Sequence, residues 1–249
     1  MNRRFLISSL ATLPFVSAAR AAVPWSAQFL AGGFDGKAYS AGLHIKLDKT
    51  WKTYWRNPGS AGIPPSITAE PTTNFAGMTF DFPLPLRIID EGGTSFGYHD
   101  EVLFPLRITP KDPGAPLSVQ LSSFFGVCQK VCTPAKFEGI LNFSPSSAST
   151  PEADLISQWQ ARVPKTGEIV RTAKVSDKYL RLELVNHVSD VFVEGPDNYY
   201  FGQPEFGLAD TNVALKIAGL KKDTDLKGVE LRITANVNGN GLDQRIVVV

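Results

Sequence analysis

The sequence predicts an all-β protein made of two antiparallel β-sandwich domains joined by a short helix. Two observations predict this fold. The chain is rich in turn formers, with 21 glycines and 18 prolines, and the segments between them are short and rich in β-branched and aromatic residues. Only one stretch, past the middle of the chain, has the spacing of an amphipathic helix. Many short strands separated by turn signals are typical of antiparallel sandwiches.

The first predicted domain covers residues 22–146 and contains several strand-like segments. Residues 41–47 alternate apolar with polar side chains, which is the period of a strand with one buried face. Residues 102–109, 117–125 and 136–143 also have the composition of strands, and turn formers lie between them.

One helix is predicted in the linker, residues 147–165. Thr150 can cap it, and Pro151 suits its first position. The apolar residues that then fall on one helical face are Leu155, Ile156, Trp159 and Val163. We therefore expect an amphipathic helix over residues 151–162.

A second sandwich is predicted over residues 166–249. Its clearest strands lie at residues 179–185, 213–217, 229–234 and 245–249. A further strand at 191–196 precedes a turn at 198–200. No motif in this half indicates chemistry, so we expect a domain for docking or spacing.

The first 21 residues have the three parts of a secretory signal peptide. Arg3 and Arg4 supply the charged start, residues 5–16 form a short apolar region, and a small-x-small cleavage site ends at Ala21. This order predicts export to the periplasm and a mature chain that begins at Ala22. The paired arginines would also suit twin-arginine export.

Composition and charge exclude several classes of protein. The formal net charge is +1, so no overall field attracts nucleic acid or anionic lipid. No segment after the N-terminus is apolar for long enough to cross a membrane, and we expect a soluble mature chain. No phosphate loop, carboxylate pair or Ser/His/Asp order stands out. We expect no cofactor and no nucleic-acid partner.

The two cysteines, Cys128 and Cys132, are the residues that indicate chemistry. They allow one intrachain pairing in an oxidising compartment. In a straight strand, residues four apart lie ~13 Å from each other, beyond the reach of a disulfide. Gly126 and Pro134 bracket the motif, and strand-like runs flank it. A hairpin with a three-residue loop would bring the two Cα atoms to ~4.5–5.5 Å, within disulfide reach.

Redox chemistry is the favoured interpretation of this pair. The disulfide closes a small loop, worth ~2 kcal/mol on the chain-entropy model, and a chain of this length can build a core without it. Lys130 is the only cation close in sequence, so we expect no strongly acidic thiol and a reaction that depends on docking. A structural disulfide stays an alternative, as does a copper or zinc site formed with His99.

Three blocks of the first domain resemble the periplasmic N-terminal part of the DsbD family of thiol:disulfide interchange proteins, and most closely its copper-tolerance (ScsB) branch. They read WKTYWRNPGSAGIPP at residues 51–65, FGYHDEVLFPL at 96–106 and CQKVCTP at 128–134. The resemblance implies an immunoglobulin-like redox domain. It also implies that Cys128 and Cys132 accept electrons from a membrane-embedded partner and reduce periplasmic thioredoxin-like proteins.

The resemblance carries two further expectations. Family members often continue into a membrane domain and a thioredoxin-like domain, which do not follow here, so the electron donor is expected to be a separate protein. Family members also shield their cysteines with an aromatic cap loop. The matching stretch is residues 90–98, which makes Phe96 the first candidate shield and Tyr98 the second.

The leading hypothesis is therefore periplasmic thiol:disulfide interchange through Cys128 and Cys132, as an electron relay or a protein-disulfide reductase. The alternative is a non-enzymatic binding module of the cell envelope, for copper or a protein partner, in which the disulfide is structural.

Overall fold

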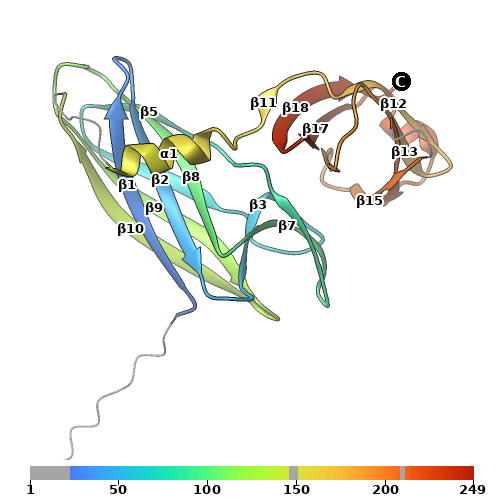
Figure 1. The fold of residues 1–249 in the computed structure, drawn as a ribbon, viewed down its shortest axis with the longest axis horizontal. Coiled ribbons are helices and arrows are strands. Elements are labelled where there is room, and N and C mark those ends of the chain that lie inside the picture. Colours follow the sequence, from blue (N-terminus) through green and yellow to red (C-terminus); the bar gives the residue numbers. More distant parts are fainter. Residues whose placement is uncertain (1–22, 146–150, 208–210) are drawn as a thin grey trace, which may run out of the picture.

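The computed structural model describes residues 23–145, 151–207 and 211–249. The predicted signal peptide and its cleavage site lie outside this part of the chain. Figure 1 shows two groups of antiparallel strands joined by one helix, which confirms the predicted all-β fold of two sandwiches with a helical linker. No described helix has the length and apolar character needed to cross a membrane.

The first sandwich consists of two sheets. One has the strand order β1 (Trp25–Phe34), β2 (Tyr39–Leu47), β8 (Glu101–Pro110) and β5 (Phe75–Phe80). The other has the order β10 (Cys132–Phe143), β9 (Leu117–Cys128), β3 (Lys52–Gly59), β7 (Gly93–His99) and β6 (Leu86–Asp90), and β4 (Ser66–Thr73) also pairs with β9. The strands predicted in this domain lie within β2, β8, β9 and β10.

Alternating side chains of these strands fill the space between the two sheets. Leu43 and Ile45 from β2 are fully buried, as are Phe104 from β8 and Trp55 from β3. Leu43 and Ile45, two residues apart, lie on the same face of β2, as the period of a strand requires. Side chains of β3 and β9 share this core, and β3 begins beside Cys128, the residue at which β9 ends.

Helix α1 (Pro151–Gln160) packs on the first sandwich, against β1, β2 and β8 (Figure 1). Ile156 and Trp159 are its buried residues, and both belong to the core of that sandwich. The helix ends two residues before the predicted end at Arg162, whose guanidinium stacks on the Trp159 ring at 4.1 Å. The predicted cap, Thr150, lies outside the described residues.

The second sandwich also has two sheets. One has the order β11 (Lys165–Thr166), β18 (Asn240–Val247), β17 (Glu230–Val237) and β14 (Asp190–Glu194). The other has the order β12 (Val170–Ser176), β13 (Tyr179–Leu184), β16 (Asn212–Ala218) and β15 (Tyr200–Phe206), and a short 3₁₀ helix, η1 (Asp223–Leu226), precedes β17. Among the strands that the structure describes, only β11 pairs in parallel, with β18. The sandwich has its own apolar core, and β14 lies against the first sandwich.

Candidate redox site at the β9–β10 turn

Cys128 is the last residue of β9 and Cys132 the first of β10, and the strand register places them opposite each other. Their Cα atoms are 4.2 Å apart, and a disulfide joins them. The predicted hairpin with a three-residue loop is therefore present. Because the long β9–β10 ladder fixes the register, the two sulfur atoms have no need of the disulfide to lie close together.

The two cysteines differ in their exposure to solvent. Cys128 is 1% exposed, whereas Cys132 is an exposed residue. Val131, beside Cys132 at the tip of the turn, is 75% exposed. A second protein can therefore approach the disulfide from the side of Cys132.

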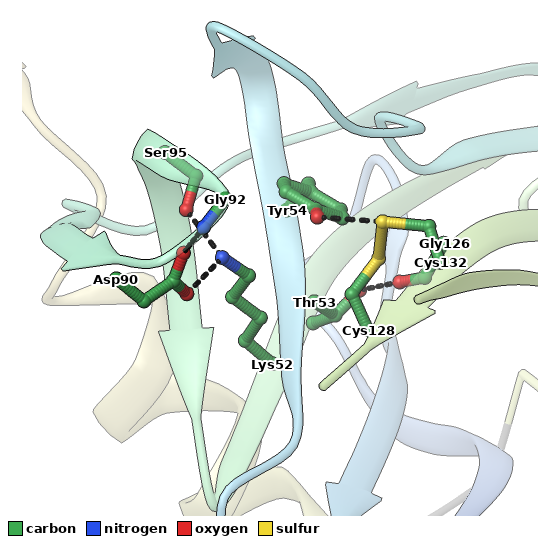
Figure 2. The surroundings of a disulfide bond; sticks show 9 residues. All are labelled: Lys52, Thr53, Tyr54, Asp90, Gly92, Ser95, Gly126, Cys128 and Cys132. Atoms are coloured by element: carbon green, nitrogen blue, oxygen red, sulfur yellow. Dashed lines mark hydrogen bonds and ion pairs between the residues drawn. A yellow bond between two sulfur atoms is a disulfide. The ribbon is translucent and has the colours of Figure 1, made fainter. Parts of the chain in front are cut away.

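Strand β3 supplies the polar contacts of the disulfide. The backbone of Lys52 pairs with Cys128, and the Thr53 hydroxyl donates to the carbonyl of Gly126 at 2.8 Å. The Tyr54 hydroxyl lies 3.0 Å from Sγ of Cys132 and donates to it in the disulfide state (Figure 2).

Burial raises the pKa of Tyr54, and the nearby charge of Asp90 raises it further. The Tyr54 hydroxyl therefore stays protonated at neutral pH. It can continue to donate a hydrogen bond if Cys132 becomes a thiolate, which is a stronger acceptor than a disulfide sulfur.

An ion pair between a buried lysine and a half-exposed aspartate ties the β6–β7 hairpin to β3. Nζ of Lys52 donates to Oδ2 of Asp90 at 2.6 Å and to Oγ of Ser95 at 2.9 Å (Figure 2). The Gly92 amide donates to Oδ1 of the same carboxylate at 2.9 Å. The hydrogen bond from Lys52 is the main reason that the pKa of Asp90 is lowered.

These residues border a cleft of about 730 Å³ at the disulfide. Both cysteines line it, together with Tyr54 and side chains of the β6–β7 hairpin. The acidic and basic side chains around it are Lys52, Asp90, Glu91, His99 and Lys130. Two exposed apolar residues lie nearby: Ile89 lines the cleft, and Val131 is in the turn between the two cysteines. The arrangement suits a protein surface that docks over Cys132.

A family model supports the chemistry that this geometry suggests. The model of the thiol:disulfide interchange protein DsbD, N-terminal, matches residues 19–143. The chain belongs to the DsbD N-terminal family.

One solved structure extends the likeness in fold beyond the matched residues. The N-terminal periplasmic domain of ScsB from Proteus mirabilis is 20% identical, with a TM-score of 0.72 over 96% of each chain, so the two-sandwich fold is shared. The reduced DsbD N-terminal domain of Neisseria meningitidis is 14% identical, with a TM-score of 0.30 over 47% of this chain and 85% of that one. No curated protein matches the chain.

The two residues that the resemblance makes candidate shields, Phe96 and Tyr98, both lie in the core of the first sandwich. Phe96 is buried against Phe192 of the second sandwich, with ring centroids 5.1 Å apart. Tyr98 is buried beside Phe104 and donates to the carbonyl of Pro83 at 2.7 Å. Phe96 and Tyr98 are two residues apart on β7, so their side chains lie on the same face of the strand, which is the face toward the core. Neither lines the cleft.

The residues that do contact the cysteines or close the cleft are Tyr54, Lys52 and Asp90, which the sequence alone did not single out. Tyr54 belongs to the first block of the DsbD-family resemblance. Lys52 is a charged residue between aromatic ones in that block, and such a residue in a buried strand is a signal that it has a partner. The partner, Asp90, is 38 residues away, and no local pattern connects the two.

The described residues offer no set of ligands for the copper or zinc site considered as an alternative. No group of three or more His, Cys, Asp or Glu side chains in this part of the chain could hold a metal ion. His99 lines the cleft, and its Nδ1 lies 3.1 Å from the carbonyl oxygen of Trp51.

Proposed function

We propose that this DsbD-family chain performs thiol:disulfide interchange in the periplasm through Cys128 and Cys132. One observation carries the proposal: an exposed Cys132 is bonded to a buried Cys128 at a cleft, and a protonated hydroxyl faces the exposed sulfur. Such a disulfide offers a partner one accessible sulfur and keeps the other as the leaving group.

The small structural value of the bond also supports a chemical role. The β9–β10 ladder already holds the two strands in register, and both sandwiches have apolar cores of their own. A disulfide that closes so short a loop adds only ~2 kcal/mol on the chain-entropy model.

The exchange begins with the thiolate of a reduced partner protein. It attacks Sγ of Cys132, a bond forms between the two proteins, and the bond to Cys128 breaks. Cys128 leaves as a thiolate and takes up a proton. The second thiolate of the partner then attacks the partner's own sulfur and releases Cys132. Two electrons have moved, so the partner is a disulfide and this chain a dithiol.

The return step oxidises the chain again. The Cys132 thiolate attacks the disulfide of an acceptor protein, and Cys128 then attacks Cys132 and releases the acceptor as a dithiol. We propose a membrane-embedded donor of the DsbD type and a periplasmic thioredoxin-like acceptor. The predicted signal peptide and the periplasmic origin of the ScsB domain support this location.

Two measurements test the proposal. Titration of the cysteine pair against glutathione should give a reduction potential well above about −300 mV, the region of structural disulfides. In periplasmic extracts, Cys128→Ser should trap a thioredoxin-like protein as a mixed disulfide, whereas Cys132→Ser, which leaves only the buried thiol, should trap far less. A potential below that limit together with no trapped partner would establish a structural disulfide instead.

A further inference from the structure

Strand β14 of the second sandwich has two faces that belong to different domains. Val191 and Val193 point into the core of the second sandwich. The alternate residues Asp190, Phe192 and Glu194 contact the first sandwich. This division follows the period of two of a strand, so five consecutive residues serve both domains.

One end of β14 holds strand β3. The carboxylate of Glu194 accepts from Nε of Arg56 at 3.0 Å and from Nη2 at 2.7 Å. The same guanidinium donates to Thr234 at 3.0 Å and stacks on the ring of Trp55 at 4.0 Å. With its side chain only 17% exposed, Arg56 is a well-packed, two-pronged anchor rather than a surface pair.

The other end of β14 holds strand β6. Asp190 accepts from Nε of Arg87 at 3.1 Å and from Nη2 at 2.9 Å. Nη2 also donates to the carbonyl of Val191 at 2.6 Å. The Arg87 side chain is 10% exposed, so this pair is shielded from water as well.

Phe192 lies between the two anchors. It is fully buried, and it belongs to the core of the first sandwich although its strand belongs to the second. Its ring centroid is 5.7 Å from that of Trp55 and 5.1 Å from that of Phe96. An apolar contact between two ion pairs fixes both the position and the direction of β14.

The two strands that β14 holds are the ones that frame the disulfide. Two residues before Arg56, strand β3 presents Tyr54 to Cys132. Three residues after Arg87, strand β6 ends at Asp90, which binds Lys52 at the cleft. Each anchor is therefore only two or three residues along its strand from Tyr54 or Asp90 at the cleft.

We propose that β14 is a clamp that positions the redox site, with Asp190, Phe192 and Glu194 as positioning residues. The clamp keeps β3 and the β6–β7 hairpin in register with the disulfide, so that the Tyr54 hydroxyl meets Cys132 when it becomes a thiolate. The second sandwich is thus a working part of the site. This inference rests on the proposed thiol chemistry of Cys132.

The test measures the reactivity of Cys132 against pH. In the Cys128→Ser protein, Cys132 is the one remaining cysteine, so its alkylation by iodoacetamide can be followed without a partner. Loss of the Tyr54 hydrogen bond to the thiolate should raise the pH midpoint of alkylation by about one unit. We expect Tyr54→Phe and Phe192→Ala each to do so, and the two together to shift it no further than Tyr54→Phe alone.

Two more variants complete the test. Glu194→Gln keeps the size of the side chain and removes one anchor charge, so it should raise the midpoint even if Phe192→Ala fails to fold. Glu230→Gln is the matched control, because it removes an exposed pair with Arg245 on the same sandwich and should leave the midpoint unchanged. None of these variants changes the five acidic or basic side chains around the cleft, Lys52, Asp90, Glu91, His99 and Lys130.

The outcomes separate the clamp from the proposed function. Unchanged midpoints in folded Phe192→Ala and Glu194→Gln protein overturn the clamp, as does an unchanged midpoint in Tyr54→Phe. If Glu230→Gln shifts the midpoint as much as Glu194→Gln, the effect is general and the clamp is also overturned. If the midpoint shifts as expected but the protein traps no partner, the clamp is supported and the proposed function is overturned.

Discussion

Removal of Asp90 should destabilise the protein more than removal of its partner Lys52. The two side chains differ in burial, since Lys52 is 8% exposed and Asp90 is 36% exposed. Asp90→Ala leaves a buried ammonium group whose remaining described hydrogen-bond partner is Ser95. Leaving a buried charge without its partner in this way costs about 3 kcal/mol. Lys52→Met leaves a carboxylate that water can reach, at a cost of about 1 kcal/mol.

A double-mutant cycle in urea measures this asymmetry. The double variant has no unpaired charge, so its free energy of unfolding should exceed that of Asp90→Ala alone, with a coupling of about 2 kcal/mol. The assay is equilibrium unfolding of the oxidised protein, followed by tryptophan fluorescence. The reasoning is refuted if Lys52→Met is the more harmful single change, or if the two single effects simply add.

The same pair predicts a pH dependence. Because Lys52 lowers the pKa of Asp90 below its ordinary value of 3.8, the contribution of the carboxylate is complete above that value and is lost as the pH falls through the lowered pKa. The difference in unfolding free energy between the parent protein and the double variant should therefore shrink below about pH 4.

Three further predictions concern single residues. Tyr54→Phe should slow the alkylation of reduced Cys132 at pH 7 roughly tenfold, measured by stopped-flow labelling, and an unchanged rate would contradict the role of the hydroxyl. Gly97→Ala should destabilise the fold by about 2 kcal/mol or more in urea, because the added Cβ would clash with the backbone oxygen of Thr53 in β3; a neutral change would refute this close packing. The hydrogen bond from Arg107 lowers the pKa of Asp35 from 3.8 to about 2. The free energy of unfolding should therefore fall less between about pH 4 and pH 2 in Asp35→Asn than in the parent protein, and an equal fall in the two proteins would contradict this.

The sequence predicted the disulfide hairpin because every determinant of it is local. The alternation of β9 and β10, the three-residue spacing and the bracketing Gly126 and Pro134 all lie within one segment of the chain. The helix was predictable for the same reason, since its apolar face and first-turn signals are contiguous. Several short strands, among them β5, β6 and β7, were not predicted, because five to seven residues carry too little periodicity.

The surroundings of the disulfide could not be predicted from local pattern. The family resemblance gives the position of Phe96 in the chain. The direction of its side chain depends on the register of β7 with β3, which the resemblance does not give. Tyr54 meets Cys132 across 78 residues of sequence, and this contact exists only once β3 and the β9–β10 hairpin share a sheet. Contacts of this kind are set by topology.

The burial of Ile156 and Trp159 shows that the core of the first sandwich extends beyond the residues of the family match. The residues recognised as a family unit end at Phe143, yet the hydrophobic interior of the first sandwich takes in helix α1 and even Phe192. A fragment cut at the end of the family match would present bare apolar surface on β1, β2 and β8. We therefore expect a stable fragment of the first sandwich to need helix α1 in addition to the residues of the family match, because the helix covers apolar surface of these strands.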